Sequence, residues 1–242
     1  MMIVSPLAKC VILSPSTSGE RTAQIDRITI HCVVGHCSAE ALGIWFQQPG
    51  HWSSNYGVDD DGNIGCYVPE NEVSQCSSSS ENDNRAITIE TASDITAPYE
   101  ITEQAYSGII RLCADICKRY NKTRLLWIAD KNSALSYSPA QNEMIITVHR
   151  WFAAKACPGD YIFNRLGQIA AAVTEQLTKA PVENFFVETV ENAPEWARPT
   201  IKKLVDRKAL VGTGDGLHLS QDLMRVLVIL DRLSLFDRGV NM

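Results

Sequence analysis

The sequence predicts an α/β fold, a mixed central β-sheet flanked by helices, followed by a small α-helical C-terminal module. Short apolar runs typical of buried strands alternate with longer segments of helical periodicity along the first three quarters of the chain. An acidic stretch between Pro181 and Pro194 then indicates a linker. We therefore assign residues 1–178 to the main domain, 179–194 to the linker and 195–242 to the module.

The predicted strands are short and rich in β-branched or apolar residues, which favours buried positions in a sheet. Asp59-Asp-Asp-Gly62 predicts a hairpin turn between two of them, because its glycine comes too early for a calcium-binding EF-hand loop. In chain order the strands are Ile28–His31, Tyr56–Val58, Ile64–Val68, Ala86–Glu90, Leu125–Ala129 and Met144–His149.

The predicted helices carry apolar residues three and four positions apart. Thr102–Asn121 has the strongest pattern, and Cys113 continues its apolar stripe, so we expect that cysteine in the core. Ser77–Asn84 is polar throughout and predicts a surface loop. The other helices are Ser38–Gln47, Asp160–Leu177, Trp196–Arg207 and Gln221–Leu233, the last capped by Ser220.

The composition argues against several classes of function. The 242 residues carry a net charge of −6, which argues against nucleic acid as the main partner. No apolar run in the sequence approaches the ~20 residues that span a bilayer, so no membrane insertion is expected. The first ten residues are apolar but lack the basic N-terminal region of a signal peptide, and Lys9 interrupts their apolar run. We therefore expect synthesis in the cytoplasm without a signal peptide. The eight cysteines are then expected to be reduced thiols.

The segment Thr147–Gly159 carries the clearest chemical signal in the chain. It contains His149 and Cys157, and imidazole and thiolate are ligands that Zn²⁺ prefers. Lys155 adds a mobile positive charge beside the same metal. A catalytic zinc usually takes three protein ligands and keeps one position open for water. We therefore expect a third ligand elsewhere in the chain.

His31 is the best candidate for this third ligand, because it ends a predicted buried strand and would be held rigidly at the edge of a cleft. The remaining histidines fit less well. His36 lies near the predicted start of a helix, His51 in a Pro-Gly loop and His218 in the distant C-terminal module.

Four segments follow one another in a recognisable order: Ile28–His31, Ser53–Gly62, Arg85–Glu90 and Thr147–Gly159. Together they resemble the zinc-dependent N-acetylmuramoyl-L-alanine amidases, the family that includes phage lysozyme-type amidases and peptidoglycan recognition proteins. The Trp151-Phe152 pair and the Cys-Pro-Gly end of the last segment are most similar to amidases of phages and prophages of Gram-positive bacteria.

The resemblance implies a peptidoglycan hydrolase that cleaves the amide bond between N-acetylmuramic acid and L-alanine with the help of Zn²⁺. Its setting would be that of an endolysin or autolysin, which reaches the cell wall after holin-type release from the cytoplasm. The alternative from a different class is a module that recognises peptidoglycan and has lost catalysis. The presence of Cys157 argues against that alternative, since a hydrolase needs the third ligand.

Amide hydrolysis also needs a proton carrier and a group that stabilises the oxyanion. Glu90 ends an apolar strand, from which it can reach the same cleft as His31, and it matches the glutamate of the family's strand. We assign oxyanion stabilisation to Lys155. Lysozyme-type members have a tyrosine before the Asp-Gly turn. Ser54 occupies that position here, and the nearby Tyr56 is expected on a different face of its strand.

The C-terminal module shows a tryptophan, a helix, Leu210-Val211-Gly212 and a second helix in succession. This order is similar to half or one repeat of an S-layer-homology-type module. A unit this short is hard to stabilise alone. We therefore expect it to dock on the main domain, to bind the cell wall or to pair with a second copy as a homodimer.

Overall fold

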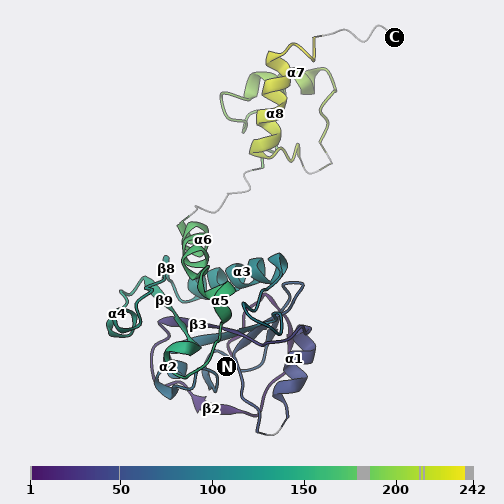
Figure 1. The fold of residues 1–242 in the computed structure, drawn as a ribbon. Helices are drawn as coiled ribbons and strands as arrows, with labels where there is room; N and C mark the ends of the chain where they lie inside the picture. The colour runs from purple at the N-terminus through teal and green to yellow at the C-terminus, as the bar shows by residue number, and fades with distance from the viewer. Residues whose placement is uncertain (1, 49, 179–185, 213, 215, 238–242) are drawn as a thin grey trace. The chain divides into compact units, whose positions relative to one another are not determined.

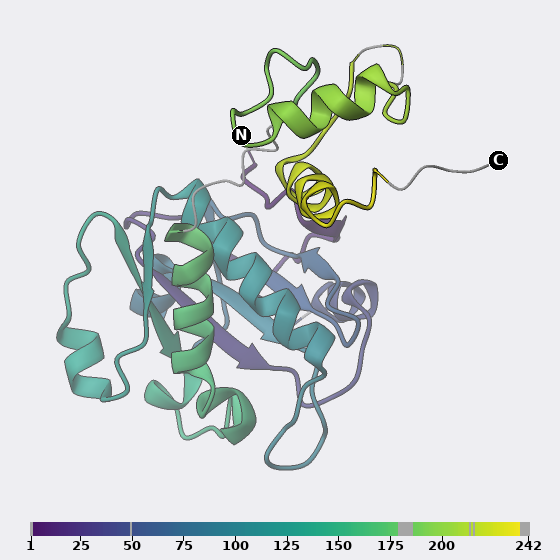
Figure 2. The same cartoon turned by 90° about the horizontal axis from the view of Figure 1, so that it is seen from above.

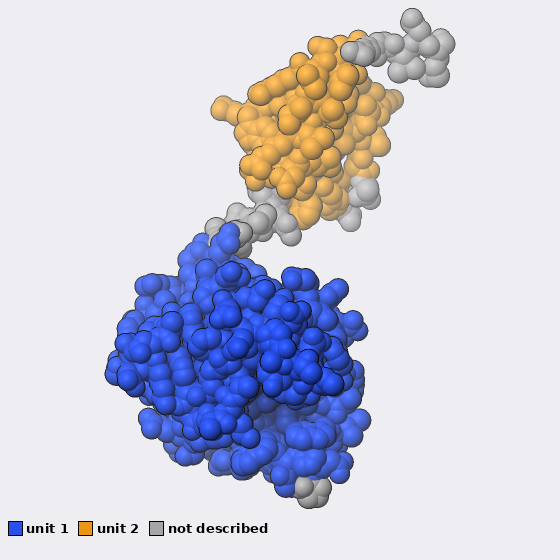
Figure 3. Space-filling model, in the orientation of Figure 1, with its two compact units in different colours: residues 1–179 blue, residues 180–242 orange. Residues whose placement is uncertain are grey.

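The computed structural model describes residues 2–48, 50–178, 186–212, 214 and 216–237. The chain forms two compact units, residues 1–179 and residues 180–242, which are coloured blue and orange in Figure 3. Each unit has a hydrophobic core of its own. None of the helices in the described ranges combines the length and the apolar character needed to cross a membrane.

The described part of unit 1 contains a seven-stranded sheet with the order β1-β5-β4-β7-β3-β9-β8. Neighbouring strands are parallel except β4 and β5, which form the antiparallel hairpin predicted around Asp59–Gly62. The strands are β1 (Ala8–Val11), β3 (Arg27–Cys32), β4 (Tyr56–Val58), β5 (Ile64–Cys66), β7 (Ala86–Thr91), β8 (Arg124–Leu126) and β9 (Glu143–Val148). A separate antiparallel pair consists of β2 (Thr17–Glu20) and β6 (Glu72–Ser74).

Helices cover both faces of this sheet, as Figures 1 and 2 show. On one face α3 (Glu103–Arg119) and α6 (Leu166–Thr178) lie side by side and pack against each other. On the other face lie α1 (Ala39–Phe46), which Ser38 caps, and α2 (Ser80–Arg85). The predicted mixed sheet flanked by helices is thus confirmed. The remaining elements of unit 1 are α4 (Lys131–Ser136), the 3-10 helix His149–Trp151 and α5 (Gly159–Phe163).

The central strands β7, β3 and β9 carry different chemistry on their two faces. Side chains alternate along a strand. Ile28 and Ile30 of β3 therefore join the hydrophobic core together with residues of α3 and α6, whereas Thr29 and His31 point to the opposite face. The parallel register places apolar residues beside apolar ones and polar residues beside polar ones. The neighbours are Ile30 with Ile89 and Val148, Thr29 with Thr88 and Thr147, and His31 with Glu90.

Three predicted elements differ from the structure in type or by more than two residues. The strand predicted over Leu125–Ala129 is β8, which ends at Leu126. The single helix predicted over 160–177 is divided into α5 and α6, because α5 ends at its C-cap Asn164. The predicted surface loop Ser77–Asn84 contains most of α2, and Asp83 within it is buried. This carboxylate can be buried because it accepts hydrogen bonds from the backbone N–H groups of Cys76 and Ser77. The sequence patterns also missed β1, β2, β6 and α4, which are too short to show a period.

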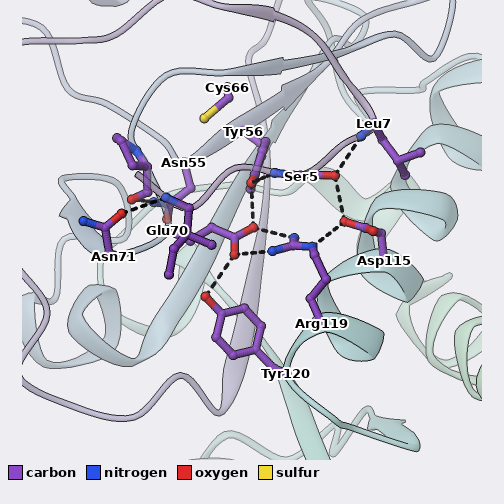
Figure 4. Close-up of polar contacts among 12 residues, drawn as sticks. Ser5, Leu7, Asn55, Tyr56, Cys66, Glu70, Asn71, Asp115, Arg119 and Tyr120 are labelled. Atoms are coloured by element: carbon purple, nitrogen blue, oxygen red, sulfur yellow. Dashed lines mark hydrogen bonds and ion pairs between the residues drawn. The ribbon is translucent and has the colours of Figure 1, made fainter. Parts of the chain in front are cut away.

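A buried carboxylate, Glu70, ties together segments that are far apart in the sequence (Figure 4). It accepts hydrogen bonds from the hydroxyls of Tyr56 and Tyr120 at 2.5 and 2.9 Å and two more from the Arg119 guanidinium at 2.5 Å. The Tyr56 hydroxyl accepts in turn from the backbone N–H of Ser5 at 2.7 Å, and burial raises the pKa of that phenol. The network therefore fastens the N-terminal segment to β4 and α3.

Unit 2 packs α7 (Arg198–Asp206) against α8 (Gln221–Arg232). Its core extends into the predicted linker, because Val187 and Ala193 are buried in it and Val187 pairs with Leu219. The described residues 186–194 therefore belong to unit 2, and their isolated apolar residues among acidic ones give no periodic signal. Residues 179–185 of the predicted linker lie outside the described ranges.

Glu70→Gln should destabilise unit 1 strongly. The amide keeps the size of the side chain but removes the bidentate carboxylate partner of the partly exposed Arg119 guanidinium, which keeps Asp115, and the loss of such charged hydrogen bonds costs about 1.5–3 kcal/mol. Urea unfolding followed by circular dichroism would measure the loss in free energy of unfolding. Glu20→Gln, at an exposed position of β2, is the matched control and should be neutral. Equal stability of the two variants would contradict a stabilising role for the network.

Candidate metal centre

The carboxyl ends of β3, β7 and β9 bring three of the predicted site residues to one edge of the sheet. His31 and Glu90 are register partners on adjacent parallel strands. His149 follows directly after β9, whose last residue, Val148, is paired with Ile30. As a result, the two imidazole rings lie with their centroids 5.2 Å apart.

Cys157 reaches the same place from the loop that follows the 3-10 helix. The backbone N–H of Arg150 donates to the Cys157 carbonyl at 3.1 Å, which folds the loop back on itself. The Cys157 Sγ atom lies 3.3 Å from Nδ1 of His31. One potential ligand atom from each of His31, His149 and Cys157 falls within 4.8 Å of the others. The structure thus brings together all three residues that the sequence predicted as ligands.

The chemistry of this group fits a metal ion with a preference for nitrogen and sulfur. Nitrogen and sulfur ligands of one tetrahedral Zn²⁺ would be separated by about 3.6 Å, close to the 3.3 Å between His31 Nδ1 and Cys157 Sγ. Burial lowers the pKa of His31 to about 3, and burial and the charge of Lys155 lower the pKa of His149. Both imidazoles are therefore neutral at pH 7, which is the form that binds metals.

Cys157 would need a neighbouring cation to become a thiolate. Its hydrogen bond with Cys32, together with burial, raises the pKa of the Cys157 thiol. A bound divalent cation would displace the thiol proton, since metal binding and deprotonation of a cysteine ligand are coupled. The three side chains thus have the donor atoms, spacing and neutral nitrogens that such an ion requires.

Glu90 lies beside this group, and in the described part of the chain only one of its two carboxylate oxygens accepts a hydrogen bond. Its Oε1 atom is 3.9 Å from His31 Nδ1 and accepts a hydrogen bond from the Cys76 thiol at 3.6 Å. The buried Oε2 atom has no partner among the residues that the structure describes. The side chain is 18% exposed, and its burial raises the pKa of Glu90 to about 7, an effect that the Cys76 hydrogen bond reduces. His31, Cys76 and Glu90 also form a second set of potential ligands.

A cavity of about 720 Å³ opens beside Cys76 and Glu90, whereas His31 is fully buried and is not among the residues that line it. Glu90, His149, Lys155 and Cys157 contribute to one part of its wall, and the exposed Lys155 makes no ion pair among those found in the described ranges. This size suits a substantial organic ligand. Helix α1 and the segments around it supply the apolar wall, with Leu42, Trp45, Phe46 and Trp52.

Three residues of the cavity wall hold a backbone conformation that residues other than glycine rarely adopt. Val34, Ser78 and Tyr99 have φ angles of 60°, 62° and 61°. Such conformations persist only where the surrounding structure enforces them, and they gather at functional sites. The sequence reasoning did not find Ser78, Cys76 or Tyr99, because nothing in their local sequence distinguishes them from surface or core residues.

The other histidines lie outside the ligand group. His36 pairs with Asp60 and Asp94 at 3.0 and 3.1 Å, and its hydrogen bond with Asp60 raises its pKa. His51 contacts the carbonyl of Trp45 at 2.8 Å, and His218 pairs with a glutamate of unit 2.

The residues at and near the family's tyrosine position are buried away from the cavity. The Ser54 hydroxyl donates to the carbonyl of Tyr56 at 2.7 Å, and Tyr56 belongs to the Glu70 network. Neither residue lines the cavity. Cys113 is fully buried, as predicted, and all eight cysteines are free thiols.

Comparison with known proteins yields one family and a set of similar folds. The family described as N-acetylmuramoyl-L-alanine amidase (Amidase_2) matches residues 21–160. This range includes all five predicted site residues. No curated protein matches the chain.

Several solved structures are similar to the chain at low sequence identity. The N-acetylmuramoyl-L-alanine amidase LysC from Clostridium intestinale is 19% identical with a TM-score of 0.46, over 67% of this chain and 95% of that one. A mutant endolysin from Bacillus subtilis is 17% identical with a TM-score of 0.49, over 69% and 99%. The Drosophila peptidoglycan recognition protein SA is 15% identical with a TM-score of 0.44, over 64% and 88%.

Proposed function

The chain belongs to the N-acetylmuramoyl-L-alanine amidase family, and we propose that it is a zinc-dependent peptidoglycan hydrolase that cleaves the bond between N-acetylmuramic acid and L-alanine. The observation that carries this proposal is the convergence of His31, His149 and Cys157 beside a cavity that also holds Glu90 and Lys155. We further propose that it acts as an endolysin or autolysin, which reaches the cell wall after its release from the cytoplasm.

The proposed chemistry divides among five side chains. His31, His149 and Cys157 would hold Zn²⁺, which when bound lowers the pKa of water and polarises a carbonyl group. Glu90 takes a proton from the attacking water and delivers it to the nitrogen of the leaving L-alanine. Lys155 stabilises the negative charge that develops on the carbonyl oxygen as the tetrahedral intermediate forms.

The alternative function is recognition of peptidoglycan without hydrolysis. Such a module would need the cavity but neither a complete ligand set nor a carboxylate with a free oxygen beside it. Glu90 Oε1 lies 3.9 Å from His31, and its second oxygen is free of partners among the described residues, which favours catalysis. The next two predictions separate the two functions.

Replacing a proposed ligand should remove both metal and activity. We expect His31→Ala, His149→Ala or Cys157→Ala to reduce bound zinc from about one ion per chain and to abolish wall hydrolysis, because each removes one of three ligands. Metal analysis and digestion of purified cell walls would measure this, with release of L-alanine amino groups but no new reducing sugars. His36→Ala is the control and should keep its zinc. Full activity of metal-free protein would refute the mechanism.

Replacing a proposed catalytic residue should separate metal binding from rate. Glu90→Gln and Lys155→Ala should keep zinc but lower kcat by roughly 10²–10³-fold, since each removes one proton-transfer or electrostatic contribution. Steady-state hydrolysis of a soluble muropeptide would give the rate. Glu103→Gln and Lys131→Ala, at exposed positions away from the cavity, are the matched controls. A near-wild-type rate for Glu90→Gln would remove this residue from proton transfer.

For unit 2 we propose attachment to the cell wall, with pairing of two copies as the other outcome to be tested. Its α8 helix contributes Met224 and Val228 to the core, yet Leu223, Val226 and Ile229 remain 43%, 50% and 56% exposed. Apolar side chains exposed together in this way indicate a surface that binds a partner.

A chain that ends at Thr178 should keep its hydrolysis of a soluble muropeptide, because unit 1 has its own core and carries the whole site. It should lose affinity for purified walls. Wall sedimentation assays would measure binding, and analytical ultracentrifugation of both chains would reveal any lost self-association. If the short chain binds walls, sediments and lyses cells as the full chain does, unit 2 has neither role.

A further inference from the structure

We propose that Ser78 positions His149 for metal binding by fixing the orientation of its imidazole ring. The inference rests on the proposed metal centre and adds to it a residue outside the ligand set. The Ser78 Oγ atom lies 2.8 Å from Nε2 of His149, a normal hydrogen-bond distance. This is the one hydrogen bond to that ring found in the described part of the chain.

The hydrogen bond determines which ring nitrogen is free. A neutral imidazole carries one N–H group and one nitrogen with a free lone pair. If Nε2 carries the proton and donates it to Ser78 Oγ, then Nδ1 of His149 is the atom with the free lone pair. Metal-binding histidines commonly donate their other N–H to an oxygen, which fixes both the tautomer and the ring plane.

The segment around Ser78 is held rigidly enough for this task. The Asp83 carboxylate accepts hydrogen bonds from the backbone N–H groups of Cys76 and Ser77, at 3.0 and 3.1 Å. Ser79 caps α2 by accepting a hydrogen bond from the backbone N–H of Asn82 at 3.2 Å. Ser78 lies between these anchors with a φ angle of 62°, a conformation that persists only where the surroundings enforce it.

The same segment is bonded to the strands that precede the ligands. The Asn82 side chain donates to the hydroxyls of Thr29 and Ser77 at 2.9 and 3.1 Å and accepts from the hydroxyl of Thr147 at 3.1 Å. Thr29 and Thr147 lie two residues before His31 and His149. Those four side chains are buried, whereas Ser78 is exposed and is held by its neighbours in the chain and by its hydrogen bond to His149.

Two substitutions in the full chain separate the effect of the Ser78 hydroxyl from the effect of the backbone conformation at this position. Ser78→Ala and Ser78→Gly both remove the hydroxyl, but only glycine adopts the positive φ angle without strain. We expect both to weaken zinc affinity by roughly 10–100-fold, as measured by competition with a chelator. Ser80→Ala, at an exposed position two residues away, should match the wild type.

A spectroscopic readout tests the orientation directly. In the zinc-loaded wild type, ¹⁵N–¹H correlation spectra should show the proton of His149 on Nε2 and the metal shift on Nδ1. Three results would overturn the inference and leave the proposed function intact. They are unchanged zinc affinity in both Ser78 variants, wild-type zinc affinity in the glycine variant alone, and coordination of zinc through Nε2 of His149. A wild-type chain that binds no zinc would overturn both.

Discussion

The parallel register of β3 with its neighbours β7 and β9 is the constraint on which the site depends. Because the three strands run in the same direction and in step, one face presents isoleucines and valine to the helices, and the other presents threonines followed by His31, Glu90 and His149. A shift of one residue in any strand would turn its isoleucines to the cavity face and its site residue into the core. The apolar core therefore specifies the geometry of the polar edge.

The sequence predicted which residues meet at the candidate site in the cases where a titratable side chain stands at the end of an apolar strand pattern or within a short motif. His31, Glu90 and His149 each close an apolar run, and parallel strands that end at one edge must bring such residues together. Cys157 was found from its residue type and its closeness to His149 in the chain. Their roles remain proposals, but their meeting in space followed from elementary sheet geometry together with the family resemblance.

What the sequence could not reveal depends on contacts between residues distant in the chain. Ser78 belongs to a run of serines that looks like a solvated loop, and only the burial of Asn82 and Asp83 turns that run into a support for the site. The burial of Val187 in unit 2 could not be predicted either, since a single apolar residue among acidic ones shows no periodicity. Local patterns identify regular elements, whereas these positions are determined by long-range hydrogen bonds and packing.

Two glutamates of unit 1 show how hydrogen bonding separates a structural carboxylate from one available for chemistry. Glu70 is fully buried and receives four hydrogen bonds, so it cannot move a proton without dismantling the network around it. Glu90 receives one weak bond from the Cys76 thiol, keeps Oε2 free of described partners and faces a cavity. Leaving a carboxylate so poorly paired costs free energy of folding, and the apolar side chains that the same strands bury on their other face contribute stability that offsets this cost. The stability of the sheet thus permits an under-bonded acid beside His31, which is what proton transfer in amide hydrolysis requires.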